Sequence, residues 1–493
     1  MILGVQHGCD TNLAIRRESL RSCLYGQLDH QQQPGRLRTP HTQQTSAKGH
    51  TAERLLHQPT VHINPDMTAR TPPSRQWRIG RRVAIVGGGP GAISTALAFL
   101  SCDYDVRVFE RRPTFEPIGG AVLLNTPVLA ILRSYGIDVT NLGEWSRTHF
   151  QNSEGTDRVV LPFNSEIERK MGIKGWHYGV LRSTAFQRMF DQLPDGVTYP
   201  NHEFVAYDEK ANEVELRFQD PTQTCTADIL VGADGIRSRV SRQAFGDPKL
   251  FHTGIRLWLA WCEQIEDIPP HKGMISHDWR YQASYFPMTH DDGSGKGKLK
   301  PGFEWWIVEP SYEGMPIPDD PKAHITNILK GWADPMPRFV EATDFDSQVF
   351  RWEIYNRPSQ KKWSRGRIVC IGDAIHPVSP YAAYGMGMAI EDGYYLAKLL
   401  DGVDLTHLED VTRGFCAYET QRVDFVNHNM EFARRLGYLF HKLPWPLAKL
   451  RDVLFDRTPL LAHFLTKGYL EKSEIETAGM TELHVKDEHP IVA

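Results

Sequence analysis

The sequence predicts an α/β fold with a Rossmann-like domain, and three observations predict it. A short apolar run, Val83–Val86, is followed by a glycine-rich turn and a helical segment, which indicates a buried parallel strand and its crossover helix. Residues 106–110 form a second apolar run, which completes a βαβ unit. The stretch 255–310 is rich in Trp, Tyr, Phe and Ile, which indicates an inserted antiparallel sheet.

Changes of composition and periodicity divide the chain into parts. The start of the chain contains the run Gln31–Gln33 and few periodic apolar positions, so we expect it to be disordered. Near the other end the pattern is helical and is interrupted at Pro444 and Pro446. The expected parts are a disordered extension (1–77), a discontinuous dinucleotide-binding domain (78–250 and 359–405), a substrate-binding sheet domain (251–358), C-terminal helices (406–470) and a polar tail (471–493).

Composition excludes several classes of protein. The formal net charge of −4 does not suggest a nucleic-acid surface. The seven cysteines show no zinc-ligand spacing, so we expect reduced thiols and no metal. The sequence contains no run of about 18 apolar residues, so we expect no integral membrane segment. We therefore expect a cytoplasmic monomer or homodimer, while the arginines of the first 40 or so residues leave a mitochondrial transit peptide open.

The turn after the first strand has the pattern of a dinucleotide-binding site. Gly87 permits the tight turn, Gly89 lets the backbone approach a pyrophosphate, and Ala92 keeps the helix close to the sheet. The helix N-terminus presents free N–H groups to phosphate. Glu110 ends the second strand, 18 residues beyond Ala92, where a carboxylate accepts hydrogen bonds from a ribose diol. The pattern fits FAD or NAD.

Two further motifs follow in order. Residues 227–238 form a strand that ends in an Asp-Gly turn, and residues 366–377 form a strand that ends in Gly-Asp. The second is followed by Pro380, a Gly-Met-Gly helix start and the pair Glu391–Asp392. In this order the three motifs resemble those of the FAD-dependent aromatic hydroxylases, the group that includes p-hydroxybenzoate and salicylate hydroxylases. The resemblance covers residues 83–400.

The resemblance implies a set of cofactor contacts and a reaction. It implies that NAD(P)H reduces FAD, that O2 adds at the flavin C4a, and that the hydroperoxide oxygenates a small aromatic, polyketide or terpenoid-type molecule by hydroxylation or epoxidation. Beyond Gly87, Gly89, Ala92 and Glu110, it implies FAD contacts at Gly120, Ala121, Arg182, Asp234, Asp373, Gly385, Met386 and Gly387. The helix that begins at Gly385 would direct its positive end at the flavin, where reduction places negative charge.

The aromatic stretch supplies the candidates for a substrate wall. Strand alternation allows only one face of the sheet to reach the pocket, so about half of these side chains belong elsewhere. Tyr285 is the candidate for orienting a substrate oxygen, with a buried core tyrosine as the alternative. Arg256 is a second catalytic candidate, although the register places it on the face opposite Leu259. The aromatic residues are Trp258, Trp261, Tyr281, Tyr285, Phe286, Trp305 and Trp306.

Several alternatives stay open on the sequence alone. The protein could be a flavin-dependent reductase, dehydrogenase or halogenase, or a non-catalytic regulatory flavoprotein. His376 is a catalytic base or, as we favour, a structural histidine beside the cofactor. The apolar and basic segment 443–455 lies on a membrane surface or, as we favour, packs on its own domain.

Overall fold

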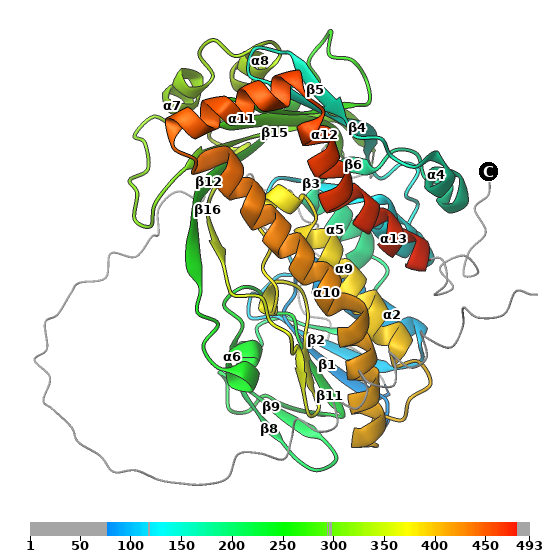
Figure 1. The fold of residues 1–493 in the computed structure, drawn as a ribbon. Helices are drawn as coiled ribbons and strands as arrows, with labels where there is room; N and C mark the ends of the chain where they lie inside the picture. Colours follow the sequence, from blue (N-terminus) through cyan, green and yellow to red (C-terminus); the bar gives the residue numbers. More distant parts are fainter. Residues whose placement is uncertain (1–75, 117–118, 293, 295–297, 481–493) are drawn as a thin grey trace, which may run out of the picture. The chain divides into compact units, whose positions relative to one another are not determined.

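The described strands form two large sheets and a small one (Figure 1). The computed structural model describes residues 76–116, 119–292, 294 and 298–480. All of them fall within the unit Thr60–Ala493. The predicted disorder of the N-terminal extension concerns residues outside the described part, apart from residues 76 and 77.

The six-stranded sheet is the predicted Rossmann-like sheet. β1 pairs in parallel with β2 on one side and with β11 on the other, and all five residues of β1 are buried. Burial on both faces explains the uninterrupted apolar run in the sequence. The strand order is β17 (Ser364–Arg365), β18 (Ile368–Cys370), β11 (Ile229–Gly232), β1 (Arg82–Val86), β2 (Asp105–Phe109) and β7 (Thr198–Tyr199).

The nine-stranded sheet extends beyond the predicted boundaries of the inserted domain. Its order is β16 (Val349–Asn356), β12 (Phe251–Glu263), β15 (Leu299–Pro310), β14 (Gln282–Asp291), β13 (Lys272–His277), β4 (Glu144–Asn152), β6 (His177–Leu181) and β3 (Ala121–Asn125), with β5 (Asp157–Val160) beside β4. Four of these strands precede residue 182. They join the sheet because β13 pairs in parallel with β4, a long-range pairing that local periodicity does not reveal.

Strand alternation separates the two faces of this sheet, as predicted. One face carries Trp258, Tyr285 and Trp305, which pack with Phe339 of the helix α8 (Met336–Ala342). The opposite face carries Leu257, Leu259, Trp306 and Trp352. Only this second face is directed at the Rossmann-like domain, as the cavity described below shows.

Helices cover both sheets. α2 and α9 pack against each other, and α10, a helix of 34 residues, packs against α9. Pro444 and Pro446 separate α10 from α11, as predicted, because proline cannot continue a helix but fits its first turn. Besides α8, the α-helices are α2 (Pro90–Ser101), α3 (Thr126–Ser134), α4 (Ser165–Met171), α5 (Arg182–Phe190), α6 (Arg239–Phe245), α7 (Pro321–Ile328), α9 (Gly385–Leu399), α10 (Leu408–His441), α11 (Trp445–Arg457), α12 (Leu460–Leu465) and α13 (Glu471–Met480).

Three further features complete the fold. The small sheet has the order β10 (Thr224–Ala227), β9 (Val214–Phe218) and β8 (Phe204–Glu209). The predicted polar tail begins with α13, so its first ten residues are helical rather than frayed, and the rest lies outside the described residues. The five described cysteines are buried, and none of them forms a disulfide within the described part of the chain. Among the described helices, none combines the length and apolarity that crossing a bilayer requires.

Candidate active site

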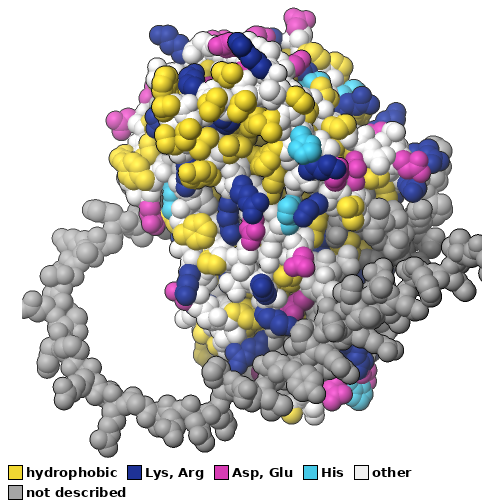
Figure 2. Space-filling model, in the orientation of Figure 1, with side chains coloured by type: hydrophobic (Ala, Val, Ile, Leu, Met, Phe, Trp, Pro, Cys, Tyr) yellow, Lys and Arg dark blue, Asp and Glu magenta, His cyan; other side chains and the backbone are white. Residues whose placement is uncertain are grey.

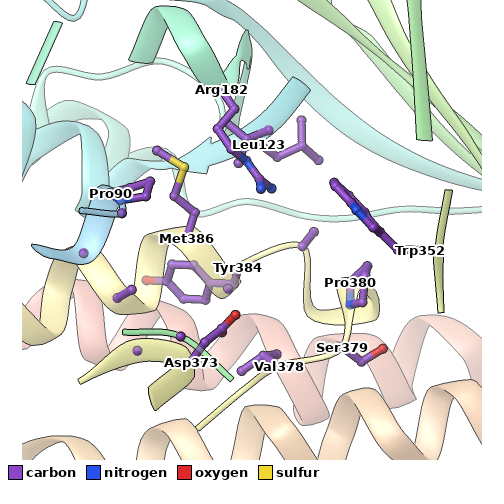
Figure 3. Close-up of a pocket in the computed structure, with 18 of the residues that line it drawn as sticks. Pro90, Leu123, Arg182, Trp352, Asp373, Val378, Ser379, Pro380, Tyr384 and Met386 are labelled. Atoms are coloured by element: carbon purple, nitrogen blue, oxygen red, sulfur yellow. The ribbon is translucent and has the colours of Figure 1, made fainter. Parts of the chain in front are cut away.

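A cavity of about 340 Å³ lies between the Rossmann-like domain and one face of the nine-stranded sheet (Figure 3). Its floor is formed by the start of α2, the turn after β18 and the start of α9. Its opposite wall is formed by β12, β15 and β16, with β3 and the first residue of α5 at the side. Segments that are almost 300 residues apart in sequence therefore share one cavity.

Two helix N-termini open onto this cavity. Gly89, Pro90 and Ala92 at the start of α2 line it, and so do Gly385 and Met386 at the start of α9. A Cβ atom added at Gly89 or Gly385 would meet no atom within 4 Å, so both backbones border open space. Free N–H groups and the helix dipole make such ends suitable for phosphate or another anion. This arrangement fits a dinucleotide cofactor.

Two of the predicted glycines permit close packing instead of lining the cavity. Gly87 has φ +116°, and a Cβ there would lie 2.2 Å from the Ala233 carbonyl oxygen. A Cβ at Gly387 would lie 2.5 Å from the Tyr384 ring. These glycines allow the turn after β1 to approach the end of β11 and allow α9 to begin against Tyr384.

Three titratable groups face the cavity. Arg182 projects from the start of α5, and its guanidinium lies 5.7 Å from the Trp352 ring (Figure 3). Asp373 lies in the Gly-Asp turn; burial raises the pKa of its carboxyl, and His376 and Arg182 oppose the rise. Glu304 lies on β15 with 2% of its surface exposed. Burial raises the pKa of Glu304 to about 8, although the Arg182 charge favours ionisation.

Gly120, just before β3, and Ala121, the first residue of β3, belong to this site. Ala121 lines the cavity, and the Gly120 carbonyl accepts a hydrogen bond of 3.1 Å from the Arg182 N–H. That bond fixes the start of α5, from which the Arg182 side chain projects. The structure thus brings both predicted residues to the predicted arginine.

Glu110 and Asp234 lie outside the lining of the cavity. Glu110 is next to the glycine turn, because a Cβ at Gly88 would lie 2.8 Å from its carboxylate. Asp234 accepts hydrogen bonds from the Ser238 hydroxyl and from the Arg239 N–H at 2.7 Å. It thereby fixes the turn before α6, while its neighbours Ala233 and Gly235 line the cavity.

A buried ionic network supports the Gly-Asp turn from below. Arg422 of α10 contacts Glu391 at 2.7 Å and Asp392 at 3.0 Å, and all three side chains are inaccessible to solvent. Asp392 accepts a hydrogen bond of 3.0 Å from the Gly372 N–H and forms a second hydrogen bond with the His376 ring. Burial alone would raise the pKa of Asp392, but His376 and Arg422 hold it below its usual value. His376 thus has the structural position that we favoured.

The structure does not bring Tyr285 or Arg256 to the cavity. Tyr285 is 2% exposed and packs with Phe339 on the opposite face of the sheet, which is the alternative considered for it. Arg256 is buried on that face too, 2.7 Å from Glu353 and 3.6 Å from Glu309. Its position agrees with the register argument and gives it a structural role.

Sequence reasoning missed several residues of the cavity lining, among them Glu304, Trp352 and Tyr384. Glu304 is the one with an available signal. It lies two positions before Trp306 in the run Phe303–Val308, whose other members are apolar, so alternation places both side chains on one face. An acid inside such a run is expensive to bury, which is itself an indication of function.

Comparisons with known proteins agree with this geometry. Residues 81–433 match the family described as "FAD binding domain". The 6-hydroxynicotinate 3-monooxygenase of Pseudomonas fluorescens is 28% identical over 357 residues, which are 70% of this chain and 88% of that protein. Klebsiella pneumoniae HpxO, solved with FAD and uric acid, has a TM-score of 0.66 at 21% identity and covers 83% of this chain and 97% of its own. A salicylate hydroxylase substrate complex has a TM-score of 0.61 at 20% identity and covers 84% of this chain and 99% of its own.

The fold and the cavity define a flavoprotein of the Rossmann-like class. The family match covers well over half of the chain, and the chain therefore belongs to the FAD-binding-domain family of FAD-dependent monooxygenases. The predicted fold class, the enzyme class and the cofactors FAD and NAD(P)H are confirmed.

Proposed function

We propose that this monooxygenase oxygenates a small, flat aromatic molecule that carries an O–H or N–H group, and that Glu304 binds this group. One observation carries the proposal. Among the described residues, no donor reaches Oε1 of Glu304, although this oxygen is buried and the carboxyl lines the cavity. A buried polar atom without a partner costs about 1–3 kcal/mol, which a bound donor would recover.

The surroundings of Glu304 favour a flat, mostly apolar ligand. Leu257, Leu259, Trp306 and Trp352 form the wall of the cavity around this single acid. Apolar walls with few polar groups are typical of small-molecule sites, in which the polar groups fix the orientation. The names of two relatives, 6-hydroxynicotinate 3-monooxygenase and salicylate hydroxylase, describe hydroxylated aromatic substrates, which supports the same choice.

The floor of the cavity holds FAD in this proposal. Gly89 and Ala92 at α2, together with Gly385 and Met386 at α9, offer the two helix ends to its anionic parts. Asp373 and Arg182 reach it from opposite sides of the cavity, and Glu110, beside the glycine turn, takes its ribose. FAD, once reduced by NAD(P)H, supplies the oxygen-activating chemistry.

The chain contributes proton transfer and water exclusion. Glu304, with a pKa of about 8, can hold a proton at neutral pH and can also accept one from the substrate. Removing a proton from a phenol-type group raises the electron density of the ring, which favours attack by an electrophilic oxygen. The leucine and tryptophan wall keeps water from the reacting atoms.

The test uses matched pairs of compounds with the purified yellow protein. Salicylate and 6-hydroxynicotinate offer a donor, whereas 2-methoxybenzoate and 6-methoxynicotinate do not. NADH and NADPH oxidation, O2 uptake and product mass are followed for each compound. With a hydroxylated compound only, we expect stimulated oxidation and a product that has gained one oxygen atom from O2, either in place of a ring hydrogen or with loss of the ring carboxylate as CO2.

The variant Glu304→Gln tests the residue itself. General acid–base catalysis contributes about 10²–10⁴-fold, so we expect at least a 100-fold fall in kcat/KM. We also expect the wild-type profile to rise with pH through about 8, where Glu304 loses its proton, and the variant to lack that rise. Glu341→Gln, on the exposed side of α8, is the control.

The outcomes separate the alternatives. Equal turnover of the methoxy compounds would overturn the role of Glu304 and leave the monooxygenase intact. NAD(P)H oxidation without oxygen incorporation would support a reductase or dehydrogenase, and a halogenated product would support a halogenase. Bound flavin that NAD(P)H never reduces would support a non-catalytic flavoprotein.

A further inference from the structure

The outer surface of α11 and the start of α12 is unusually apolar (Figure 2). Figure 2 shows hydrophobic side chains gathered over the region in which Figure 1 labels these helices. We call this surface the apolar cap. It consists of Trp445, Leu447, Leu450, Val453, Leu454 and Leu460, whose side chains are 38–58% exposed. Contiguous exposed apolar patches usually mark a binding surface.

The inner face of α11 is firmly attached to the protein. Phe455 is buried near Phe440 of α10, and Arg451 donates hydrogen bonds to the carbonyls of Leu439 at 2.6 Å and Asp278 at 3.0 Å. Arg158 of β5 pairs with Asp456 at 2.6 Å. The helix therefore has its own anchoring face, and the apolar cap is a second face turned outward.

The charges at the apolar cap are mainly positive. Lys442, Lys449 and Arg457 are exposed there. The acids of α11 are Asp452 and Asp456, and both are paired with Arg158. Within a chain of formal net charge −4, this surface is locally cationic, which complements an anionic lipid surface.

The position of Lys449 favours a lipid surface over a protein partner. It lies between Leu447 and Leu450 on the exposed side of α11. Protein interfaces are depleted of lysine at their core. At a bilayer surface, by contrast, a lysine stem lies along the apolar region while its ammonium group reaches the lipid phosphates.

We propose that the apolar cap binds this monooxygenase to an anionic membrane surface, with α11 lying in the plane of the lipid headgroups. Apolar side chains enter the boundary of the acyl chains, and Lys442, Lys449 and Arg457 contact anionic headgroups. The proposal concerns peripheral binding and depends on no feature of the cavity. Of the two interpretations that the sequence left open for segment 443–455, it selects binding to a membrane surface.

The test measures binding of the FAD-loaded full chain to vesicles. Sucrose-loaded vesicles of phosphatidylcholine alone, or of phosphatidylcholine with phosphatidylserine, are sedimented at low and at physiological salt. We expect binding to the anionic vesicles that weakens as salt rises. Removing two apolar side chains in Leu447→Ser/Leu450→Ser should lower the partition coefficient at least tenfold. Lys449→Gln should lower it about fivefold on anionic vesicles only.

The control carries the same kind of change elsewhere. Ile79→Ser/Val205→Ser alters exposed side chains of the other domain and should leave binding unchanged. Retained flavin absorbance shows that each variant is folded. Absence of wild-type binding to both vesicle types, or binding that the leucine double variant does not reduce, would overturn the proposal. A dimer in light scattering that the double variant dissociates would instead assign the surface to a second copy of the chain.

Discussion

Glu304 makes a quantitative prediction about stability and pH. Its carboxyl is 2% exposed, and burial raises its pKa to about 8 from an ordinary value of 4.5. Between these two values the folded protein holds a proton that the unfolded chain has lost. Raising the pH therefore favours the unfolded chain, and stability falls from about pH 4.5 until the folded protein also ionises near pH 8.

The size of the effect follows from the two pKa values. One pKa unit corresponds to 1.36 kcal/mol, so the wild-type protein should lose roughly 5 kcal/mol of unfolding free energy across this window. With an unfolding entropy of about 2.1 cal/mol/K per residue, this loss corresponds to roughly 5 °C in the unfolding midpoint. Glu304→Gln keeps a neutral side chain of similar shape at every pH and should not show the loss.

The measurement compares thermal unfolding of the FAD-loaded wild type and Glu304→Gln between pH 5 and pH 9 at one scan rate. The two proteins should unfold at similar temperatures at pH 5, and the variant should be the more stable one at pH 9. Glu341→Gln, on the surface of α8, should follow the wild type throughout. Parallel curves for wild type and Glu304→Gln would refute the assignment of a buried, neutral carboxyl.

Three further predictions concern other parts of the protein. Gly89→Asp places a carboxylate at the open floor of the cavity, so the variant should purify without yellow colour yet keep its circular dichroism spectrum; retained flavin would contradict this. Arg422→Met leaves Glu391 and Asp392 buried without a counter-charge, which should cost about 3–5 kcal/mol in denaturant unfolding, and an unchanged midpoint would contradict it. Tyr285→Phe should leave kcat/KM unchanged in the NAD(P)H oxidation assay, because its ring faces away from the cavity; a tenfold fall would restore it as a candidate.

Local backbone signals in the sequence predicted the floor of the cavity well. Gly89, Asp373 and Gly385 each belong to a turn or helix start that a few neighbouring residues define. Their convergence followed from the family resemblance and from the rule that parallel strands end at one edge of a sheet. All three residues line the cavity, and their contacts with FAD stay a prediction.

The wall of the cavity depended on information that local patterns lack. Strand alternation places Tyr285 and Phe286 on opposite faces of the sheet, but it does not show which face meets the cofactor domain. That choice is made by the pairing of β13 with β4, which joins residues more than 100 positions apart. The same pairing explains why this sheet includes four strands that precede the predicted domain boundary at residue 251, namely β3, β4, β5 and β6. The sequence marks Glu304 as an acid on the face of Trp306, but placing it in the cavity requires knowing which face meets the cofactor domain.

The network around Arg422 links the cofactor turn to a part of the chain that carries none of the three motifs. Gly372 is held by Asp392, and the charge of Asp392 is balanced from α10, some 30 residues later. A shortened chain that ended before Arg422 would still contain every recognisable motif, yet two carboxylates would lie in the interior with no cation beside them. A truncation designed from the motifs alone would therefore remove the counter-charge of this network and destabilise the Gly-Asp turn.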